Sequence, residues 1–126
     1  MIYGIGIDLL ETGRMEKIVE KWREKFLARV FTDIEIAYCA RHAQAAIHYG
    51  ARFAAKEAFL KALGIGLGMG VKLREIGVIH DEKGKPSLKL SGQAKAQIEA
   101  KGIAAVHLSL SHTSKYATAV VVLEKK

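Results

Sequence analysis

The C-terminal part of the chain carries the pattern that most limits its fold. Residues 105–111 alternate apolar and polar side chains, which predicts a half-buried β-strand. A tight turn at Ser114 and Lys115 then leads into a last strand, predicted over residues 116–123. Strands joined by so short a turn pair antiparallel. Because helices and strands follow one another irregularly upstream, we predict an α+β fold with a largely antiparallel sheet packed against a long central helix.

Hydrophobic periodicity and capping residues predict the remaining elements. Ile2, Ile5 and Ile7 with interleaved glycines predict a short, buried first strand that ends at Asp8. A helix capped by Thr12 is expected to run to about Val30. The further predicted elements are a short helix opened by a Thr32–Glu35 capping box, a long helix over 46–63 ending at Gly64, a flexible loop with Gly64, Gly66, Gly68 and Gly70, strands over 73–80 and 87–90, and a helix from Ser91 to Gly102.

Three stripes run along the predicted first helix when its residues are placed at ~100° steps. The apolar stripe, which should face the core, consists of Met15, Ile18, Val19, Trp22 and Phe26. A basic ridge consists of Arg14, Lys17, Lys21 and Lys25, and an acidic ridge of Glu16, Glu20 and Glu24. The basic ridge is either a solvated surface with i,i+3 pairs such as Lys17–Glu20 or a docking edge for an acidic partner.

Composition limits the class of protein without choosing a function. A length of 126 residues suits one domain, residues 1–126, and one Pro and one Cys exclude a collagen-like chain or a disulfide scaffold. The excess of 20 Lys and Arg over 13 Asp and Glu gives +7, which favours nucleic acid, a phosphorylated ligand or an acidic protein as partner. Because no apolar run reaches the ~18 residues of a membrane span, we expect a cytoplasmic protein.

Two acidic residues are the main candidates for chemistry. Glu57 and Lys61 are i,i+4 on the predicted long helix, where they form either a structural pair or part of a site. Asp8 follows a buried strand and either caps a turn or binds a hard cation together with Glu57. Magnesium suits the second possibility, because it takes one or two protein carboxylates and completes its shell with phosphates and water.

Other candidate motifs carry less information. Ser111 and His112 suggest either a polar hairpin corner or a Ser/His hydrolase, although no G-x-S-x-G elbow surrounds Ser111. His42, His48 and His80 lack metal-ligand spacing, and Cys39 has no C-x-x-C partner. The glycine-rich loop follows a helix and precedes a strand, which is the opposite of a dinucleotide-binding motif.

Four motifs together resemble the holo-[acyl-carrier-protein] synthases, the small 4′-phosphopantetheinyl transferases. They are Gly4-Ile5-Gly6-Ile7-Asp8, residues 52–62, Gly84-Lys85-Pro86 and Ser109-Leu110-Ser111-His112, and the resemblance covers nearly the whole chain. It implies the fold of that family and an Mg²⁺-dependent reaction in fatty acid biosynthesis. In that reaction the phosphopantetheine arm of coenzyme A moves to a serine of an apo acyl carrier protein, which releases adenosine 3′,5′-bisphosphate.

The resemblance also implies roles for individual residues. Asp8 and Glu57 would hold the magnesium ion against the pyrophosphate of coenzyme A, and Lys61 would neutralise charge on the leaving phosphate. Glu57, directly or through a metal-bound water, is the candidate base for the carrier's serine. The residues implied to contact coenzyme A are Arg52, Lys61, Pro86 and His107.

The resemblance gives the basic ridge and the assembly a meaning as well. Arg14 matches the family's carrier-docking arginine, so we interpret the ridge, with Lys17 and Lys21, as a docking surface for the acidic carrier. Family members form homotrimers with sites between subunits. Such an assembly would let Arg52 and Glu57 reach one ligand, although they lie ~140° apart around an ideal helix.

Two rival functions remain from the residues alone. A nucleic-acid-binding module would explain the positive charge, but the aromatic residues are not interleaved with Lys and Arg as a stacking platform requires. We therefore expect no nucleic-acid partner. A Mg²⁺-dependent phosphoesterase would use the same two acids, with water as the acceptor.

Overall fold

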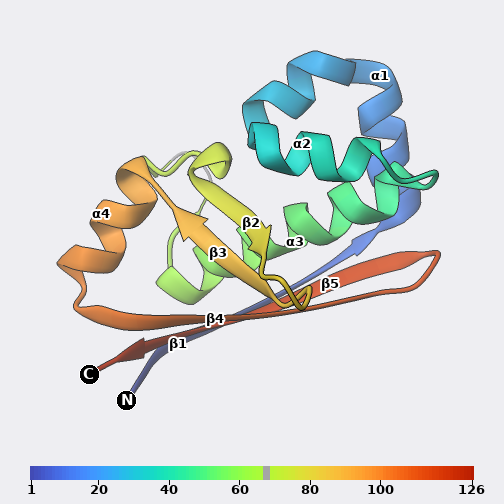
Figure 1. Cartoon of the computed structure of the whole chain (residues 1–126). Helices are drawn as coiled ribbons and strands as arrows, with labels where there is room; N and C mark the ends of the chain where they lie inside the picture. Colours follow the sequence, from blue (N-terminus) through green and yellow to red (C-terminus); the bar gives the residue numbers. More distant parts are fainter. Residues whose placement is uncertain (67–68) are drawn as a thin grey trace.

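The computed structural model describes residues 1–66 and 69–126 (Figure 1). Residues 67–68 of the predicted glycine-rich loop, including Gly68, lie outside the described residues. One sheet has three strands in the order β1-β5-β4, and the other pairs β2 with β3; each of these pairings is antiparallel. The elements are β1 (Ile2–Glu11), α1 (Thr12–Val30), α2 (Asp33–Ala40), α3 (Ala45–Leu63), the 3₁₀-helix η1 (Leu73–Glu75), β2 (Ile76–His80), β3 (Pro86–Leu90), α4 (Gly92–Ala100), β4 (Ile103–His112) and β5 (Tyr116–Lys125).

The predicted α+β architecture is confirmed, because α3 lies along the three-stranded sheet and contacts all of its strands (Figure 1). The long helix ends as predicted at Gly64, which adopts the left-handed conformation with φ +80°. The Thr32–Glu35 capping box is also present, with each side chain accepting a hydrogen bond from the other residue's backbone N–H. Among the described residues, we find no helix with the length and hydrophobicity needed to span a bilayer.

Two glycines of β1 allow α3 to cross this strand at backbone contact. A Cβ atom on Gly4 would overlap the carbonyl oxygen of Ala62, and one on Gly6 would overlap that of Ala58. Side chains alternate between the two faces of a strand, so Asp8 shares its face with these glycines. The close crossing therefore directs Asp8 toward α3.

The prediction of a short, buried first strand is wrong. β1 continues past Asp8 to Glu11, and Asp8 itself pairs with Ala119 of β5. Ile5 and Ile7 lie on the opposite face from the glycines and are exposed. The reason is steric, because only glycine fits beneath α3 and the large side chains of β1 must take the other face. This outer face continues onto β5 through Val122 and Val120, the register partners of Ile5 and Ile7. Its apolar residues are Ile2, Ile5, Ile7, Leu9, Val120 and Val122.

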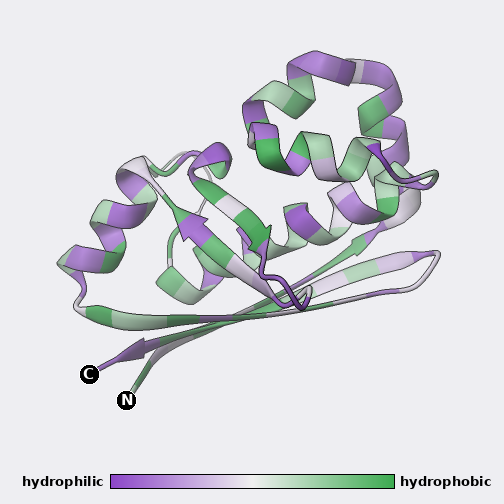
Figure 2. Ribbon diagram, viewed as in Figure 1, coloured by the Kyte–Doolittle hydropathy of each residue, from purple (hydrophilic) through white to green (hydrophobic). Residues whose placement is uncertain are grey.

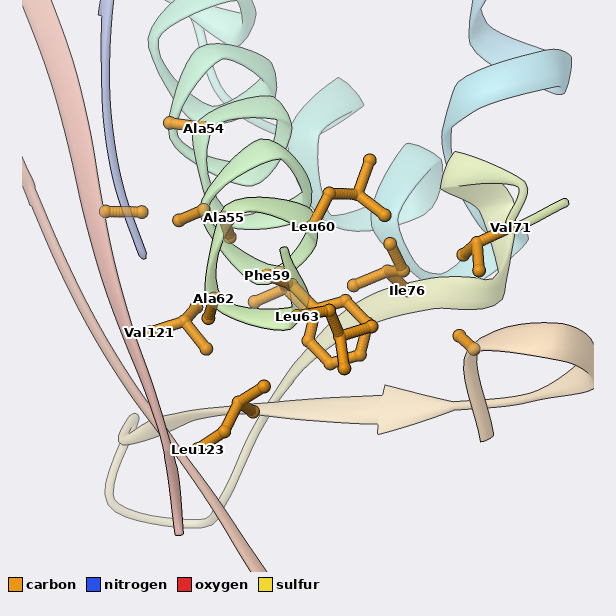
Figure 3. Packing of buried hydrophobic residues seen from close by; sticks show 14 of the residues in the cluster. Ala54, Ala55, Phe59, Leu60, Ala62, Leu63, Val71, Ile76, Val121 and Leu123 are labelled. Atoms are coloured by element: carbon orange, nitrogen blue, oxygen red, sulfur yellow. The ribbon is translucent and has the colours of Figure 1, made fainter. Parts of the chain in front are cut away.

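The main core lies between α3 and the two sheets. Phe59 and Leu63 of α3 pack toward Ile76 of β2 and Val121 and Leu123 of β5 (Figure 3). Most of α3 is buried, as expected for a helix covered on several sides. A second cluster joins α1, α2 and α3 through Met15, Phe31, Cys39 and Tyr49. Burial raises the pKa of the Cys39 thiol to about 12, so this cysteine stays protonated and packs as an apolar residue.

The first helix differs from the predicted single amphipathic helix. Met15 is fully buried, but Trp22 is 53% exposed, so the predicted apolar stripe does not face the core along its whole length. Arg23 has φ 46° and ψ −127°, which interrupts the helix directly after Trp22. A helical wheel assumes an unbroken helix, but here Trp22 before the break is exposed, whereas Phe26 beyond it packs against the second cluster. Figure 2 shows the hydrophilic colour along much of α1.

Two predicted side-chain caps and one predicted strand boundary also differ. Thr12 does not cap α1; Glu11 is the N-cap residue, and the Thr12 hydroxyl donates instead to the Ser114 carbonyl at 2.7 Å. Ser91 occupies the N-cap position of α4 without a capping hydrogen bond from its side chain. Residues 73–75 of the predicted strand 73–80 form the 3₁₀-helix η1. Thr12 does not cap the helix because its hydroxyl is hydrogen-bonded to Ser114, a tertiary partner more than a hundred residues away in the sequence.

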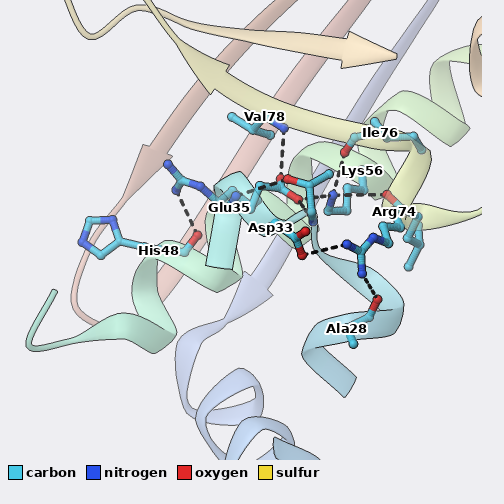
Figure 4. Close-up of polar contacts among 11 residues, drawn as sticks. Ala28, Asp33, Glu35, His48, Lys56, Arg74, Ile76 and Val78 are labelled. Atoms are coloured by element: carbon cyan, nitrogen blue, oxygen red, sulfur yellow. Dashed lines mark hydrogen bonds and ion pairs between the residues drawn. The ribbon is translucent and has the colours of Figure 1, made fainter. Parts of the chain in front are cut away.

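A buried ion pair connects the helices with the small sheet (Figure 4). Lys56 of α3 donates from Nζ to Glu35 Oε1 of α2 at 2.7 Å, and both side chains are completely buried. Lys56 Nζ also donates to the carbonyl oxygens of Leu73 and Ile76, at 3.1 and 2.6 Å. Glu35 Oε2 accepts from the Val78 backbone N–H at 3.0 Å. Because both charges are fully hydrogen-bonded, the pair is stable inside the core and fixes α2, α3 and β2 together.

Replacing Lys56 with methionine should destabilise the protein by roughly 3–5 kcal/mol, since Glu35 would remain as an uncompensated buried charge. Urea unfolding of Lys56→Met measures this loss. Lys95→Met on the exposed surface of α4 makes the same chemical change and should stay within about 0.5 kcal/mol of the parent chain. Equal unfolding midpoints for the two variants would contradict a structural role for the pair.

Adding a single methyl group at Gly6 should also be costly. Gly6→Ala places a Cβ against the Ala58 carbonyl, and overpacking of this kind costs about 1–3 kcal/mol or more. Gly13→Ala is the matched control, because nothing lies within 4 Å of a Cβ at that position. Thermal unfolding should show a lowered midpoint for Gly6→Ala alone; an unchanged midpoint would show that α3 can move away from β1 freely.

Candidate functional site

Asp8, Glu57 and Lys61 meet where α3 crosses β1. Lys61 Nζ donates to Asp8 Oδ1 and to the Ile7 carbonyl oxygen, both at 3.0 Å. The Asp8 side chain is 17% exposed and that of Lys61 is 54% exposed, so the pair lies at the rim of the crossing. Lys61 thus pairs with Asp8, and the alternative of a Glu57–Lys61 structural pair is absent from the ion pairs of the described residues.

Glu57 is half-buried on the turn of α3 that precedes Lys61. Burial is the main cause that raises the pKa of its carboxyl, and the negative charge of Asp8 raises it further, while Lys61 acts in the opposite direction. Asp8 and Glu57 are therefore close enough to repel each other. A cation between them would relieve this repulsion.

The chemistry of these donors fits magnesium. Two carboxylates supply hard oxygen ligands and leave most of an octahedral shell for water and phosphate oxygens. Within the described residues, no group of three or more His, Cys, Asp or Glu side chains is arranged to hold a metal ion. A closed zinc site, which needs about four protein ligands, therefore has no counterpart there.

A second candidate site surrounds Arg52, on α3. Arg52 is only 2% exposed. Its Nη1 donates to the His48 carbonyl oxygen at 3.1 Å. Its Nε and Nη2 are buried and have no hydrogen-bond partner in the described structure. The guanidinium lies over the Tyr38 ring, 4.1 Å from the centroid. Buried donors without partners are rare, so this cation is suited to an anionic ligand.

A cavity of about 210 Å³ adjoins the guanidinium. Its lining comes from α2, α3, β2, the turn before β3, the start of β3, and β4, and consists of Tyr38, His48, Ala51, Arg52, His80, Gly84, Pro86, Leu110 and His112. Two residues that the sequence assigned to coenzyme A, Arg52 and Pro86, are thus brought together. His112, for which the sequence offered no role, lines the same cavity, whereas Ser111 is exposed on the neighbouring position of β4.

His107 lies elsewhere in the same chain. Its ring Nε2 is 2.6 Å from Glu124 Oε1, and its side chain is 56% exposed on the outer face of the sheet. In the strand register it lies opposite Val122, which lies opposite Ile5. His107 is therefore separated from the Arg52 cavity and shares a face with the exposed isoleucines of β1.

The basic ridge of α1 is open to solvent. Arg14, Lys17 and Lys21 are exposed, and none of them has a carboxylate partner among the ion pairs of the described residues. The predicted Lys17–Glu20 pair is likewise absent there. Farther along α1, an open groove of about 680 Å³ is lined by Ile18, Trp22, Lys25, Phe26 and Arg29. This groove has an apolar floor and basic edges, and it extends the basic ridge farther along α1.

The sequence alone missed two sets of residues. The buried Glu35–Lys56 pair gave no signal beyond the capping box, which explains only the backbone bond of Glu35. The rings around Arg52 come from four separate parts of the chain, so no local spacing brings Tyr38, His48, His80 and His112 into one group.

Comparison with known proteins identifies the family. The family model described as the 4′-phosphopantetheinyl transferase superfamily matches residues 4–121. The chain belongs to this superfamily. The resemblance drawn from the four sequence motifs is confirmed, and so is the predicted enzyme class, a phosphopantetheinyl transferase.

Its relatives are similar over their whole lengths. The chain is 54% identical to a holo-[acyl-carrier-protein] synthase of Syntrophus aciditrophicus, covering 98% of this chain and 97% of that protein. Among solved structures, the holo-[acyl-carrier-protein] synthase of Neisseria meningitidis has a TM-score of 0.91 and 37% identity, covering 99% and 100% of the two chains. The Bacillus anthracis protein of the same name, in complex with CoA (3′,5′-ADP), has a TM-score of 0.82 and 38% identity, covering 100% and 99%.

Proposed function

We propose that this chain is a holo-[acyl-carrier-protein] synthase that transfers 4′-phosphopantetheine from coenzyme A to a serine of an apo acyl carrier protein. The reaction releases adenosine 3′,5′-bisphosphate and serves fatty acid biosynthesis. The observation that carries the proposal is the group of Asp8, Glu57 and Lys61 at the β1–α3 crossing, in a chain so similar to proteins of that name. Residues 1–126 would act as one domain, in the cytoplasm.

Magnesium is the proposed cofactor, with Asp8 and Glu57 as its protein ligands. The ion would supply positive charge against the pyrophosphate of coenzyme A. Burial raises the pKa of Glu57, and repulsion from Asp8 raises it further; a cation between the two carboxylates would relieve this repulsion. Lys61 is held next to Asp8 by its hydrogen bond and is half exposed, so it can turn toward a phosphate that enters the site.

The protein side chains then divide the work of phosphoryl transfer. The carrier's serine oxygen forms a bond to the β-phosphorus of coenzyme A, and the bond from that phosphorus to the bridging oxygen breaks. The electron pair leaves with the 5′-phosphate of the adenosine bisphosphate, where Lys61 neutralises the growing charge. The serine proton would pass to Glu57, directly or through a bound water.

Coenzyme A would use the cavity at Arg52. The unpartnered donors of the buried guanidinium suit the 3′-phosphate, and Pro86 lies in the same cavity, where the family places the adenine. Lys61 would contact the phosphates at the other site. His107 would reach the ligand only from a neighbouring subunit, because it lies on the outer face of the sheet.

A homotrimer with sites between subunits is part of this proposal. The exposed apolar face of β1, with Ile5, Ile7 and Leu9, is of the kind that proteins cover by association. His107 shares this face through the register Ile5–Val122–His107. Packing of copies through this face would therefore bring His107 toward the ligand of another subunit.

The basic ridge of α1 is the proposed docking surface for the acyl carrier protein. Arg14, Lys17 and Lys21 are exposed and have no carboxylate partner in the described part of the chain. An acidic carrier would be attracted by these free charges, which raises the rate of encounter and makes it sensitive to salt.

The proposed function is tested by the mass of an apo acyl carrier protein after incubation with coenzyme A and the enzyme. We expect the gain of one phosphopantetheine group with Mg²⁺ and none after chelation. Asp8→Asn and Glu57→Gln should each abolish the gain while circular dichroism stays unchanged. Glu99→Gln, at an exposed position of α4, is the matched control and should transfer normally. Release of phosphate with no change in the carrier would instead indicate a phosphoesterase.

Reversing the charge of Arg14 should weaken carrier docking alone. Arg14→Glu replaces attraction by repulsion, each worth about 1 kcal/mol or less at an exposed site, so KM for the carrier should rise roughly 5- to 30-fold. KM for coenzyme A should not change. Lys95→Glu makes a similar charge reversal on exposed α4 and should leave both constants unchanged. A carrier KM equal to that of the parent chain would remove Arg14 from the docking surface.

A further inference from the structure

The cavity at Arg52 is walled by histidines from three elements. His48 of α3, His80 at the end of β2 and His112 at the end of β4 all line it. The His48 and His112 rings have centroids 5.7 Å apart. The Tyr38 ring stacks on the His80 ring at 5.0 Å and 13°. These rings line the cavity together with the buried guanidinium of Arg52.

The charged and titratable groups around this cavity are almost all basic. The region of α2 contributes Tyr38, Arg41, His42, the protonated Cys39 and Glu35, and α3 contributes His48, Arg52 and Lys56, the partner of Glu35. β2 and the turn after it contribute His80 and Asp81, and β4 contributes His112. Glu35 is already neutralised by Lys56. Asp81 is the only other carboxylate in this set, and it acts on His80 but is not among the causes that shift the pKa of His48.

These surroundings favour the neutral form of His48 and of His80 while no anion is present. Burial lowers the pKa of His48, and the positive charges of His42, Arg52, His112 and His80 lower it further. Burial and Arg52 also lower the pKa of His80, against a smaller opposing effect of Asp81. A dianion placed among them would act in the opposite direction, since a nearby opposite charge favours the protonated imidazole.

We propose that His48, His80 and His112 are ligand-binding residues for a phosphomonoester dianion in the Arg52 cavity, and that His48 and His80 take up protons when the dianion enters. Under the proposed function, on which this inference rests, the dianion is the 3′-phosphate of coenzyme A. Arg52 supplies the fixed charge and two free donors. Each protonated imidazole adds a charge and a second N–H donor, which the neutral ring lacks. The site therefore selects coenzyme A over its 3′-dephospho form, and it does so more strongly at lower pH.

The sign of the pH dependence follows from linkage. A group whose pKa rises on binding strengthens binding fully below its pKa in the free protein, and this gain is lost as the pH rises through its pKa in the complex. The phosphate has its own second pKa of about 6, so its ionisation increases affinity only up to roughly neutral pH. Above that pH the histidines alone remain, and the affinity for coenzyme A should fall.

Calorimetric titration of the full chain tests this coupling, with coenzyme A and 3′-dephospho-coenzyme A as probes. Between about pH 7 and pH 8.5, above the phosphate pKa, affinity for coenzyme A should fall roughly 5- to 10-fold, as expected for the loss of about one bound proton. Buffers of different ionisation enthalpy should report proton uptake for coenzyme A. The 3′-dephospho form should bind with no uptake and an affinity that changes less than about twofold.

Variants at His80 separate charge from structure. His80→Gln should reduce proton uptake and flatten the pH dependence, whereas His80→Lys should also flatten it but retain high affinity at the upper pH. The C2–H signals of the histidines in the NMR spectrum of the parent chain give a second readout that needs no substitution. In the free protein His48 and His80 should titrate below the ordinary histidine pKa of about 6.5, and coenzyme A should raise the pKa of both.

The outcomes separate this inference from the proposed function. Binding of coenzyme A with no proton uptake and no change in the histidine signals would overturn the inference alone. Proton-coupled binding of coenzyme A without transfer to the carrier would support the inference and overturn the proposed reaction. Failure of coenzyme A to bind at any pH would overturn both.

Discussion

The backbone contact between β1 and α3 is the constraint on which the rest of the site depends. Gly4 and Gly6 have no side chains to hold the helix away, so the carbonyl oxygens of Ala58 and Ala62 lie directly against the strand. Asp8 follows on the same face of β1, and Glu57 lies one residue before Ala58 on α3. The two acids are thus held close by the main chain, which costs little conformational entropy when a cation binds.

A buried ion pair supports the other end of the binding surface. Lys56 of α3 and Glu35 of α2 fix the two helices to β2, and Tyr38 lies one helical turn beyond Glu35. That position brings the Tyr38 ring beneath the guanidinium of Arg52 and beside His80. The network has a structural purpose in its own right, but it also holds the aromatic and basic walls of the cavity in place. Stability and ligand binding are therefore linked through neighbouring residues of α3, Lys56 and Arg52.

The errors of the sequence-based predictions have physical causes. Ile5 and Ile7 were assigned to the core because large aliphatic residues are usually buried, yet the helix approaches the glycine face and leaves them outside. The helical wheel predicts Trp22 in the core, but the helix is interrupted at the next residue, Arg23, and Trp22 is exposed. Thr12 was assigned as a cap from its position, but its hydroxyl is taken by the distant Ser114 carbonyl. In each case a tertiary contact or a local break outweighed a preference that is real but weak.

The sequence by itself determined what depends on neighbours along the chain: the alternating strands of the last hairpin, the Thr32–Glu35 capping box, the long helix ended by Gly64, and the motifs that identify the superfamily. The tertiary structure alone decided which side chains meet across the fold. It brings Asp8 against Lys61, Glu35 against Lys56, and three histidines around Arg52. Capping and periodicity act within a few residues and leave a local signal, whereas these contacts join positions 21 and 53 residues apart and exist only once the layers have packed.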